Sequence, residues 1–199
     1  MAASLLFVVA AYLIGSISFA VVASKLFRLP DPHTYGSGNP GATNVLRTGN
    51  KAAAIVTLLG DALKGALAVA LAQRLGPQFG VAAWTVPAVA LAVFVGHLYP
   101  IFHRFAGGKG VATAGGIVAM LSWPVALVLT VIWLVMAVGF KISSLAALTT
   151  AALLPIAMFY VEGNALAAWA MLPIAALLFW RHRTNIRQLL AGKERVIGQ

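Results

Sequence analysis

This sequence predicts an all-α integral membrane protein, a polytopic bundle of about seven transmembrane helices. Of its 199 residues, 61% are hydrophobic and only 9% are charged, whereas soluble domains carry roughly 25% charged residues. The mean hydropathy is +0.94. Long apolar stretches of the length that crosses a bilayer as a helix alternate with short polar loops. Together these observations exclude the soluble globular and disordered classes.

The apolar stretches cover residues 2–24, 52–73, 81–102, 111–140, 142–160 and 165–180. The fourth is ambiguous, because about 45 Å of helix is long for one crossing and short for two. Pro124 lies near its centre, and proline disfavours helix in the residue before it but is common where a helix starts. We therefore predict two short helices joined by a tight turn. A re-entrant hairpin at the same place is the alternative.

Charge distribution predicts the orientation. With seven crossings and the N-terminus outside, all but two of the fourteen Lys and Arg residues lie at the inner face, as the positive-inside rule requires. The exceptions are Arg74 outside and Lys64 within a span. The outer loops then cover residues 74–80, the turn near Pro124, and residues 161–164. The C-terminus lies inside, and chemistry is expected at the cytoplasmic face of the membrane.

Composition limits the kinds of site that the chain can build. There is no cysteine, and four Asp and Glu residues face fourteen Lys and Arg residues. Disulfides, thiolate nucleophiles and a carboxylate-built metal site are therefore not expected, nor is a cofactor. The net charge of +10 suits anionic lipid or an anionic substrate. The basic residues are spread over several loops, so no nucleic-acid partner is expected.

Two glycine-rich loops have the chemistry of anion sites. The first, residues 36–44, contains Ser37, Gly38 and Asn39 and is followed by Arg47. Glycines let successive backbone N–H groups converge on an anion, and arginine adds a bidentate donor. Alternatively, this is a polar loop that caps the next span.

The second glycine-rich loop is Gly107, Gly108, Lys109 and Gly110, directly before a predicted helix start. A helix N-terminus, flexible glycines and one lysine form an anion site. The alternative is an ordinary loop with a snorkelling lysine.

Two further segments place donors at the same face. Ser143 and Ser144 are candidate ligands, or one of them caps the following helix. His182 and Asn185 share one helix face if the last span continues beyond the membrane. The alternative for this segment is a basic cluster that contacts anionic lipid. Within the second span, Asp61 and Lys64 are expected to pair with each other, because an unpaired charge there is costly.

At these residues the chain resembles the bacterial acyl-phosphate-dependent glycerol-3-phosphate acyltransferases, the PlsY family. The resemblance covers the whole chain, and its motifs occur in order: residues 36–44 with Arg47, residues 96–113, residues 141–145, and His182, Asn185 and Glu194. It implies a single acyltransferase domain over residues 1–199. The reaction would be transfer of a fatty acyl group from acyl phosphate to the 1-hydroxyl of sn-glycerol 3-phosphate. The products would be lysophosphatidate and inorganic phosphate, in the first step of bacterial phospholipid synthesis.

The resemblance and the donor inventory together give the expected roles. The expected catalytic residues are Ser37, Lys109, His182 and Asn185. The expected substrate-binding residues are Gly38, Asn39, Arg47, Gly107, Gly108, Gly110, Ser143 and Ser144. The general base is either His182 or the phosphate of the acceptor substrate.

The expected partners are acyl phosphate, glycerol 3-phosphate and membrane lipid, in the bacterial inner membrane. No metal is expected, and a monomer is compatible with the sequence, which predicts no oligomeric state. The alternative function is a carrier or flippase for a phosphorylated solute or lipid. The Asp61–Lys64 pair and the break near Pro124 favour it, but no inverted repeat accompanies them.

Overall fold

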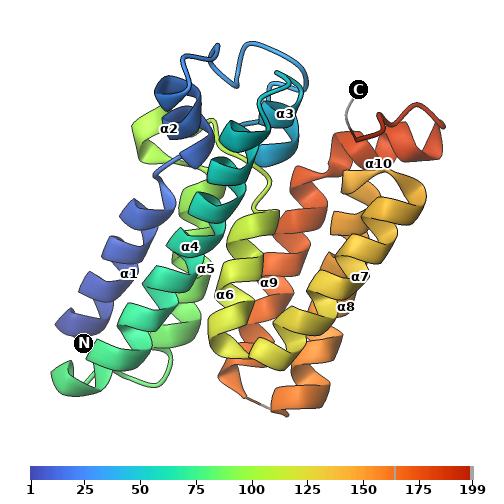
Figure 1. The fold of residues 1–199 in the computed structure, drawn as a ribbon. Coiled ribbons are helices and arrows are strands. Elements are labelled where there is room, and N and C mark those ends of the chain that lie inside the picture. Colours follow the sequence, from blue (N-terminus) through green and yellow to red (C-terminus); the bar gives the residue numbers. More distant parts are fainter. Residues whose placement is uncertain (164, 198–199) are drawn as a thin grey trace. The chain divides into compact units, whose positions relative to one another are not determined.

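A computed structural model describes residues 1–163 and 165–197, so Asn164 of the expected outer loop 161–164 lies outside the described residues. Within them the secondary structure is helical and contains no strand. The α-helices are α1 (Ala2–Gly15), α2 (Phe19–Leu26), α3 (Ala42–Leu46), α4 (Lys51–Leu75), α5 (Thr85–Leu98), α6 (Val111–Leu121), α7 (Trp123–Phe140), α8 (Ser143–Glu162), α9 (Leu166–Arg181) and α10 (Arg183–Leu190) (Figure 1). Two short 3-10 turns are η1 (Gly76–Phe79) and η2 (Ile101–His103). The chain divides into two compact units, Met1–Leu121 and Ser122–Gln199.

The described helices confirm an all-helical membrane protein. Four segments are long and apolar enough to cross a bilayer: Lys51–Phe79, Thr85–His103, Trp123–Phe140 and Ser143–Glu162. The bent pair of α1 and α2 makes a fifth if it counts as one span, and α6 and α9 are shorter apolar helices. The count of seven crossings and the orientation of the termini stay predictions.

The ambiguous stretch 111–140 is broken where the sequence predicts. Ser122 is extended, with φ −157° and ψ 98°, and separates α6 from α7. Pro124 lies in the first turn of α7, where its fixed φ suits a helix and its missing N–H costs no hydrogen bond. The predicted pair of short helices is confirmed, and the break also divides the two units.

Composition predicts one straight helix over residues 2–24, and this expectation is wrong. The first apolar stretch bends by 40° between α1 and α2. Lys64 Nζ donates a hydrogen bond of 2.7 Å to the carbonyl of Ile17, which lies at this break. A buried lysine from α4 thus satisfies a backbone carbonyl that the interrupted helix leaves without its usual partner.

Glycines set the close packing of the first unit. A Cβ at Gly15 of α1 would collide with the Val93 carbonyl of α5, and a Cβ at Gly116 of α6 would collide with the Ala62 carbonyl of α4. Small residues of this kind let helix backbones approach closely in membranes. The result is that α1 packs on α5, and α4 packs on α5 and α6.

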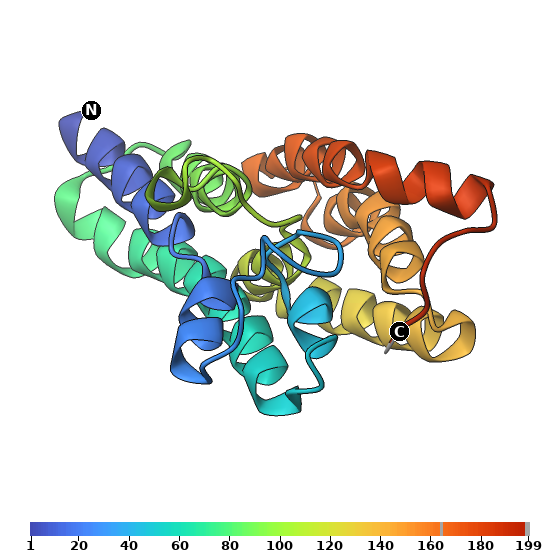
Figure 2. The same cartoon turned by 90° about the horizontal axis from the view of Figure 1, so that it is seen from above.

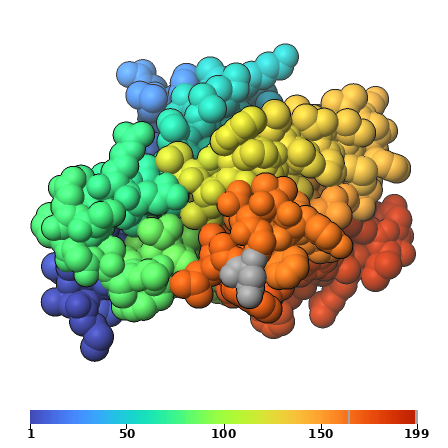
Figure 3. Space-filling model, turned by 90° about the horizontal axis from the view of Figure 1, so that it is seen from below, coloured from blue at the N-terminus to red at the C-terminus, as the bar shows by residue number. Residues whose placement is uncertain are grey.

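The two ends of the first unit differ in character. At one end, the loop between α2 and α3 lies where α4 and α6 begin (Figures 1 and 2). There α2, α3 and α4 share a small core of Ala20, Ala23, Val45, Ala53 and Ala54. The other end holds the start of α1 and the turn after α4 (Figure 3). The glycine-rich loops are therefore at the first of these ends.

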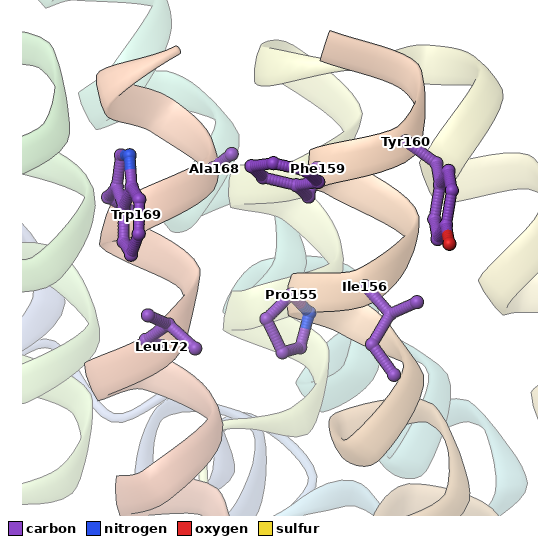
Figure 4. A pocket seen from close by; sticks show the side chains of 7 residues that line it. All are labelled: Pro155, Ile156, Phe159, Tyr160, Ala168, Trp169 and Leu172. Atoms are coloured by element: carbon purple, nitrogen blue, oxygen red, sulfur yellow. The ribbon is translucent and has the colours of Figure 1, made fainter. Parts of the chain in front are cut away.

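In the second unit, α8 packs against both α7 and α9. The residues after α10 fold back, because Ile197 N donates to the Lys141 carbonyl at 2.7 Å. A hollow of about 450 Å³ lies between α8 and α9 and is lined mainly by apolar side chains, among them Pro155, Phe159, Trp169 and Leu172 (Figure 4). It contains none of the polar residues expected in the site.

Candidate active site

Asn44 organises the first glycine-rich loop. It is buried, with 2% of its surface exposed. Its side-chain oxygen accepts hydrogen bonds from Ser37 N at 2.9 Å and Ser37 Oγ at 3.2 Å, and Arg47 Nη1 lies 3.5 Å away. Its amide nitrogen donates to the carbonyls of Pro32 at 2.9 Å and Tyr35 at 3.2 Å. One side chain therefore brings Ser37 and Arg47, two predicted site residues, to the same place.

Two glycines of this loop have backbone conformations that side chains disfavour. Gly36 has φ +60° and Gly38 has φ +65°. A Cβ at Gly36 would also collide with Asn44 Oδ1. The loop thus depends on glycine for its turn, while Ser37 and Gly38 stay exposed and Asn39 is half-buried.

The second glycine-rich loop is laid over the end of α5 and leads into α6. Gly108 N donates to the His97 carbonyl at 3.2 Å, and a Cβ at Gly107 would collide with that same carbonyl. Gly110 has φ +89°, and its carbonyl accepts the hydrogen bond of Ala114 N at 2.8 Å, in the first turn of α6. Lys109 is half-buried at the helix N-terminus, whose backbone dipoles favour anions. The Gly108 N–H thus donates its hydrogen bond within the protein.

A histidine joins the two glycine-rich loops. His33 Nδ1 lies 2.6 Å from Asp31 Oδ1, and His33 Nε2 lies 2.9 Å from the Ala106 carbonyl. Both neighbours are hydrogen-bond acceptors, so both contacts are hydrogen bonds only when the imidazole is doubly protonated. The Pro40 carbonyl also lies against Gly108. The first unit therefore places Ser37, Arg47 and the Gly107–Gly110 loop within one connected framework.

This histidine clasp gives a pH-dependent prediction. Hydrogen bonds from the His33 backbone and then its side chain hold the pKa of Asp31 below its ordinary value. A lowered carboxyl pKa stabilises the folded protein above the ordinary value of about 3.9, and this contribution is lost as pH falls through the folded pKa. Asp31→Asn should therefore unfold at a lower temperature than wild type at pH 5–7, and the gap should narrow as pH falls below about 3.9. Thermal unfolding in detergent measures it, and Glu162→Gln, at an exposed carboxylate, is the control. A gap that persists unchanged at pH 3 contradicts the prediction.

In the second unit, a carboxylate gathers two of the predicted ligands. Glu194 Oε1 accepts hydrogen bonds from Ser144 Oγ at 2.8 Å and Asn185 Nδ2 at 2.7 Å. The residue before α8 is Ile142, and no side chain caps this helix. Ser143 and Ser144 therefore do not serve as helix caps, and Ser144 is turned to Glu194 instead.

His182 lies at a helix junction. The last span does not continue as one helix, the condition under which His182 and Asn185 would share a face, because α9 ends at Arg181 and α10 begins at Arg183. His182 is buried, and its Nδ1 lies 2.8 Å from the Leu178 carbonyl. A carbonyl only accepts, so Nδ1 carries the hydrogen, and in the neutral ring Nε2 is the nitrogen that can accept one. The junction nevertheless keeps Asn185 with Ser144 and Glu194.

The Asp61–Lys64 pair predicted within the second span is present. Lys64 Nζ lies 2.8 Å from Asp61 Oδ1, and both side chains are almost fully buried. His97 Nδ1 approaches the same carboxylate oxygen at 3.5 Å. A buried ion pair of this kind fits the expected structural role.

The structure thus joins some of the predicted residues within each unit: Ser37 and Arg47 through Asn44, and Ser144 and Asn185 through Glu194. Ser37, Gly38, Asn39, Arg47 and residues 107–110 belong to the first unit, and Ser143, Ser144, His182 and Asn185 belong to the second. The two side chains that organise these groups, Asn44 and Glu194, were not among the predicted site residues, although both belong to the motifs that carry the family resemblance. In the described part of the chain, no group of three His, Asp or Glu side chains is arranged to hold a metal.

Comparison with known proteins identifies relatives of this chain. A family model described as glycerol-3-phosphate acyltransferase matches residues 5–192. A glycerol-3-phosphate acyltransferase of Cupriavidus pinatubonensis is 59% identical over 197 residues, which are 99% of this chain and 98% of that protein. One from Neisseria meningitidis is 55% identical over 192 residues, 96% of each chain.

Solved structures are similar over the same length. A crystal structure of PlsY, an integral membrane glycerol 3-phosphate acyltransferase, in its glycerol 3-phosphate form has a TM-score of 0.90 and 38% identity. The match covers 98% of this chain and 96% of that one. The lysophosphatidic acid form of PlsY has a TM-score of 0.87 at the same identity, over 98% of this chain and 95% of that one.

Proposed function

The chain belongs to the glycerol-3-phosphate acyltransferase family, and from this premise we propose that it transfers a fatty acyl group from acyl phosphate to the 1-hydroxyl of sn-glycerol 3-phosphate. The products are lysophosphatidate and inorganic phosphate. The related PlsY structures are of glycerol 3-phosphate and lysophosphatidic acid forms, which correspond to the acceptor and product of this reaction. Family membership favours this enzyme over the carrier.

One observation of the structure supports a phosphorylated donor in particular. The Gly107–Gly110 loop ends at the N-terminus of α6 and contains Lys109, which is the arrangement that binds a phosphate group with backbone dipoles and one cation. An acyl phosphate is a mixed anhydride with a good leaving group, so a covalent enzyme intermediate is unnecessary. The enzyme needs to position two anions and stabilise developing charge.

In the proposed reaction the acyl group passes directly from the donor to the acceptor. The 1-hydroxyl oxygen of glycerol 3-phosphate attacks the carbonyl carbon of the donor, and the bond from that carbon to the phosphate oxygen breaks. The hydroxyl proton passes to a base, and inorganic phosphate leaves. We assign Ser37, Gly38, Gly107, Gly108 and Lys109 to binding of the donor phosphate and the developing oxyanion.

The acceptor is assigned to residues with complementary charge and hydrogen bonding. Arg47 and Lys109 supply positive charge for its phosphate, and Asn39 and Gly110 are further substrate-binding residues of the two glycine-rich loops. Ser143, Ser144, His182 and Asn185 bind the acceptor by hydrogen bonds. In the structure, Ser144 Oγ and Asn185 Nδ2 donate hydrogen bonds to Glu194. The acceptor substrate would use the same two donors, so we expect these hydrogen bonds to be rearranged when it binds. The site faces the cytoplasm, in the bacterial inner membrane.

The base is proposed to be the acceptor's own phosphate, whose second pKa is about 6, while His182 binds. On this basis His182→Gln should raise KM for glycerol 3-phosphate by no more than about tenfold, because it weakens one hydrogen bond worth about 0.5–1.5 kcal/mol, and it should reduce kcat less. Steady-state kinetics with each substrate varied separately measures both constants. A fall in kcat of roughly 10²–10⁴-fold would instead make His182 the base.

The proposed function is tested with purified protein in a lipidic medium. Phosphate release should require both acyl phosphate and glycerol 3-phosphate, and lysophosphatidate should form in equal amount. The matched control replaces acyl phosphate by an acyl thioester of the same chain length, which should give no product. Product from the thioester alone, or movement of glycerol 3-phosphate across a membrane without turnover, would overturn the proposal.

A further inference from the structure

Three buried polar side chains of the first unit have no part in the proposed chemistry. Asp61, Lys64 and His97 are 3%, 3% and 7% exposed, and they lie within the spanning helices α4 and α5. Charged groups are expensive in such a place and usually serve a specific purpose. Lys64 has one, since it donates to the Ile17 carbonyl at the break between α1 and α2.

His97 lies between the buried carboxylate and the glycine loop. Its Nδ1 faces Asp61 Oδ1 at 3.5 Å. Its other nitrogen, Nε2, lies so close to Gly108 that a Cβ on that residue would collide with it. The His97 backbone also contacts the loop, because its carbonyl accepts the hydrogen bond of Gly108 N at 3.2 Å. The two edges of one ring thus contact the carboxylate and the loop.

This arrangement restricts the loop. Asp61 is an acceptor, so its contact with His97 favours the tautomer with hydrogen on Nδ1 and fixes the direction of the ring. The fixed ring then bounds the space of Gly108, which the Pro40 carbonyl also limits. The Asp61 carboxylate, buried within a spanning helix, in this way restricts the Gly107–Gly110 loop before α6 to one position.

We propose that Asp61 and His97 are positioning residues, in which Asp61 orients the His97 ring and His97 fixes the Gly107–Gly110 loop for binding the donor phosphate. The inference rests on the proposed function for the identity of the donor. It assigns the buried carboxylate to donor binding in addition to its pairing with Lys64. The acceptor residues of the second unit are not part of it.

Kinetics of Asp61→Asn and His97→Gln test the proposal. His97→Gln keeps an amide near the position of Nε2 but has no nitrogen at the position of Nδ1, so both variants lose the oriented contact. Each should lower kcat/KM for acyl phosphate by about 10- to 100-fold, as expected for small misplacement of a binding group. KM for glycerol 3-phosphate should change less than KM for acyl phosphate, because only Lys109 and Gly110 of this loop are also assigned to the acceptor. The kcat/KM of the double variant for acyl phosphate should be no lower than that of the less active single variant, because both substitutions remove the same contact.

A second measurement does not depend on activity. Hydrogen exchange of the backbone N–H groups of residues 106–113 should be faster in Asp61→Asn and His97→Gln than in wild type. The control is Thr57→Val, which removes another fully buried polar group of α4, whose hydroxyl donates within the helix to the Ala53 carbonyl. Thr57→Val should leave both the exchange and the kinetic constants unchanged.

The outcomes separate the inference from the proposed function. If wild-type protein does not use acyl phosphate, the proposed function fails, and the hydrogen exchange still decides whether Asp61 and His97 fix the loop. If wild type uses acyl phosphate but the variants change both substrates equally, show additive losses, or exchange at the wild-type rate, the inference fails.

Discussion

Lys109→Met should lower kcat/KM by about 10²–10³-fold, the usual effect of removing one group that stabilises developing charge. Methionine keeps much of the length and apolar character of the lysine side chain but has no charge. Lys109 is the single charged residue in the loop from Ala106 to Thr113, directly before the N-terminus of α6. No nearby cation in that loop can replace it. Initial rates with both substrates at saturating and limiting concentrations measure the loss.

The control for this variant is Lys25→Met, which removes an exposed lysine in the last turn of α2. It changes the net charge of the protein equally, so it reports any general attraction of anionic substrates. Lys25→Met should retain nearly wild-type kinetics, and Lys109→Arg should recover part of the loss because it restores the charge. Equal losses in Lys25→Met and Lys109→Met would contradict a specific role for Lys109.

The elements that the sequence predicts well are those with local causes. Pro124 has the same effect on the backbone in any fold, so the break between α6 and α7 was predictable. The bend between α1 and α2 was not predicted, although Gly15, Ser16 and Ser18 lie at it within the mostly apolar residues 2–24. The partner at that bend is Lys64, 47 positions along the chain from Ile17, and only the folded structure brings the two together.

The same distinction holds for the site. Glycine-rich loops beside basic residues indicate anion binding because glycine has few steric restrictions and cations attract anions in every context. Asn44 and Glu194 are different, since their importance lies in how many partners they hold at once. Glu194 is 50 positions from Ser144, and no local sequence pattern predicts the contact between them.

Asn44→Asp should reduce kcat/KM by more than about 10²-fold and destabilise the fold by about 1–3 kcal/mol. The aspartate keeps the oxygen that accepts from Ser37, but its second oxygen replaces the nitrogen that donates to the carbonyls of Pro32 and Tyr35. Buried carbonyls left facing a carboxylate lose their hydrogen bonds and are repelled, and each such loss costs about 1–3 kcal/mol. The new negative charge also lies beside Arg47 and weakens its attraction for an anion.

A second asparagine of the same region is the matched control. Asn50 precedes α4, and its side chain accepts a hydrogen bond from Ala53 N at 2.9 Å. Asparagine and aspartate serve equally well at this position of a helix, because the role requires only an acceptor. Asn50→Asp should therefore leave both the unfolding temperature and kcat/KM close to wild type. The same exchange of atoms is thus expected to be harmless where an asparagine only accepts and severe where it also donates, and equal behaviour of the two variants would contradict the organising role of Asn44.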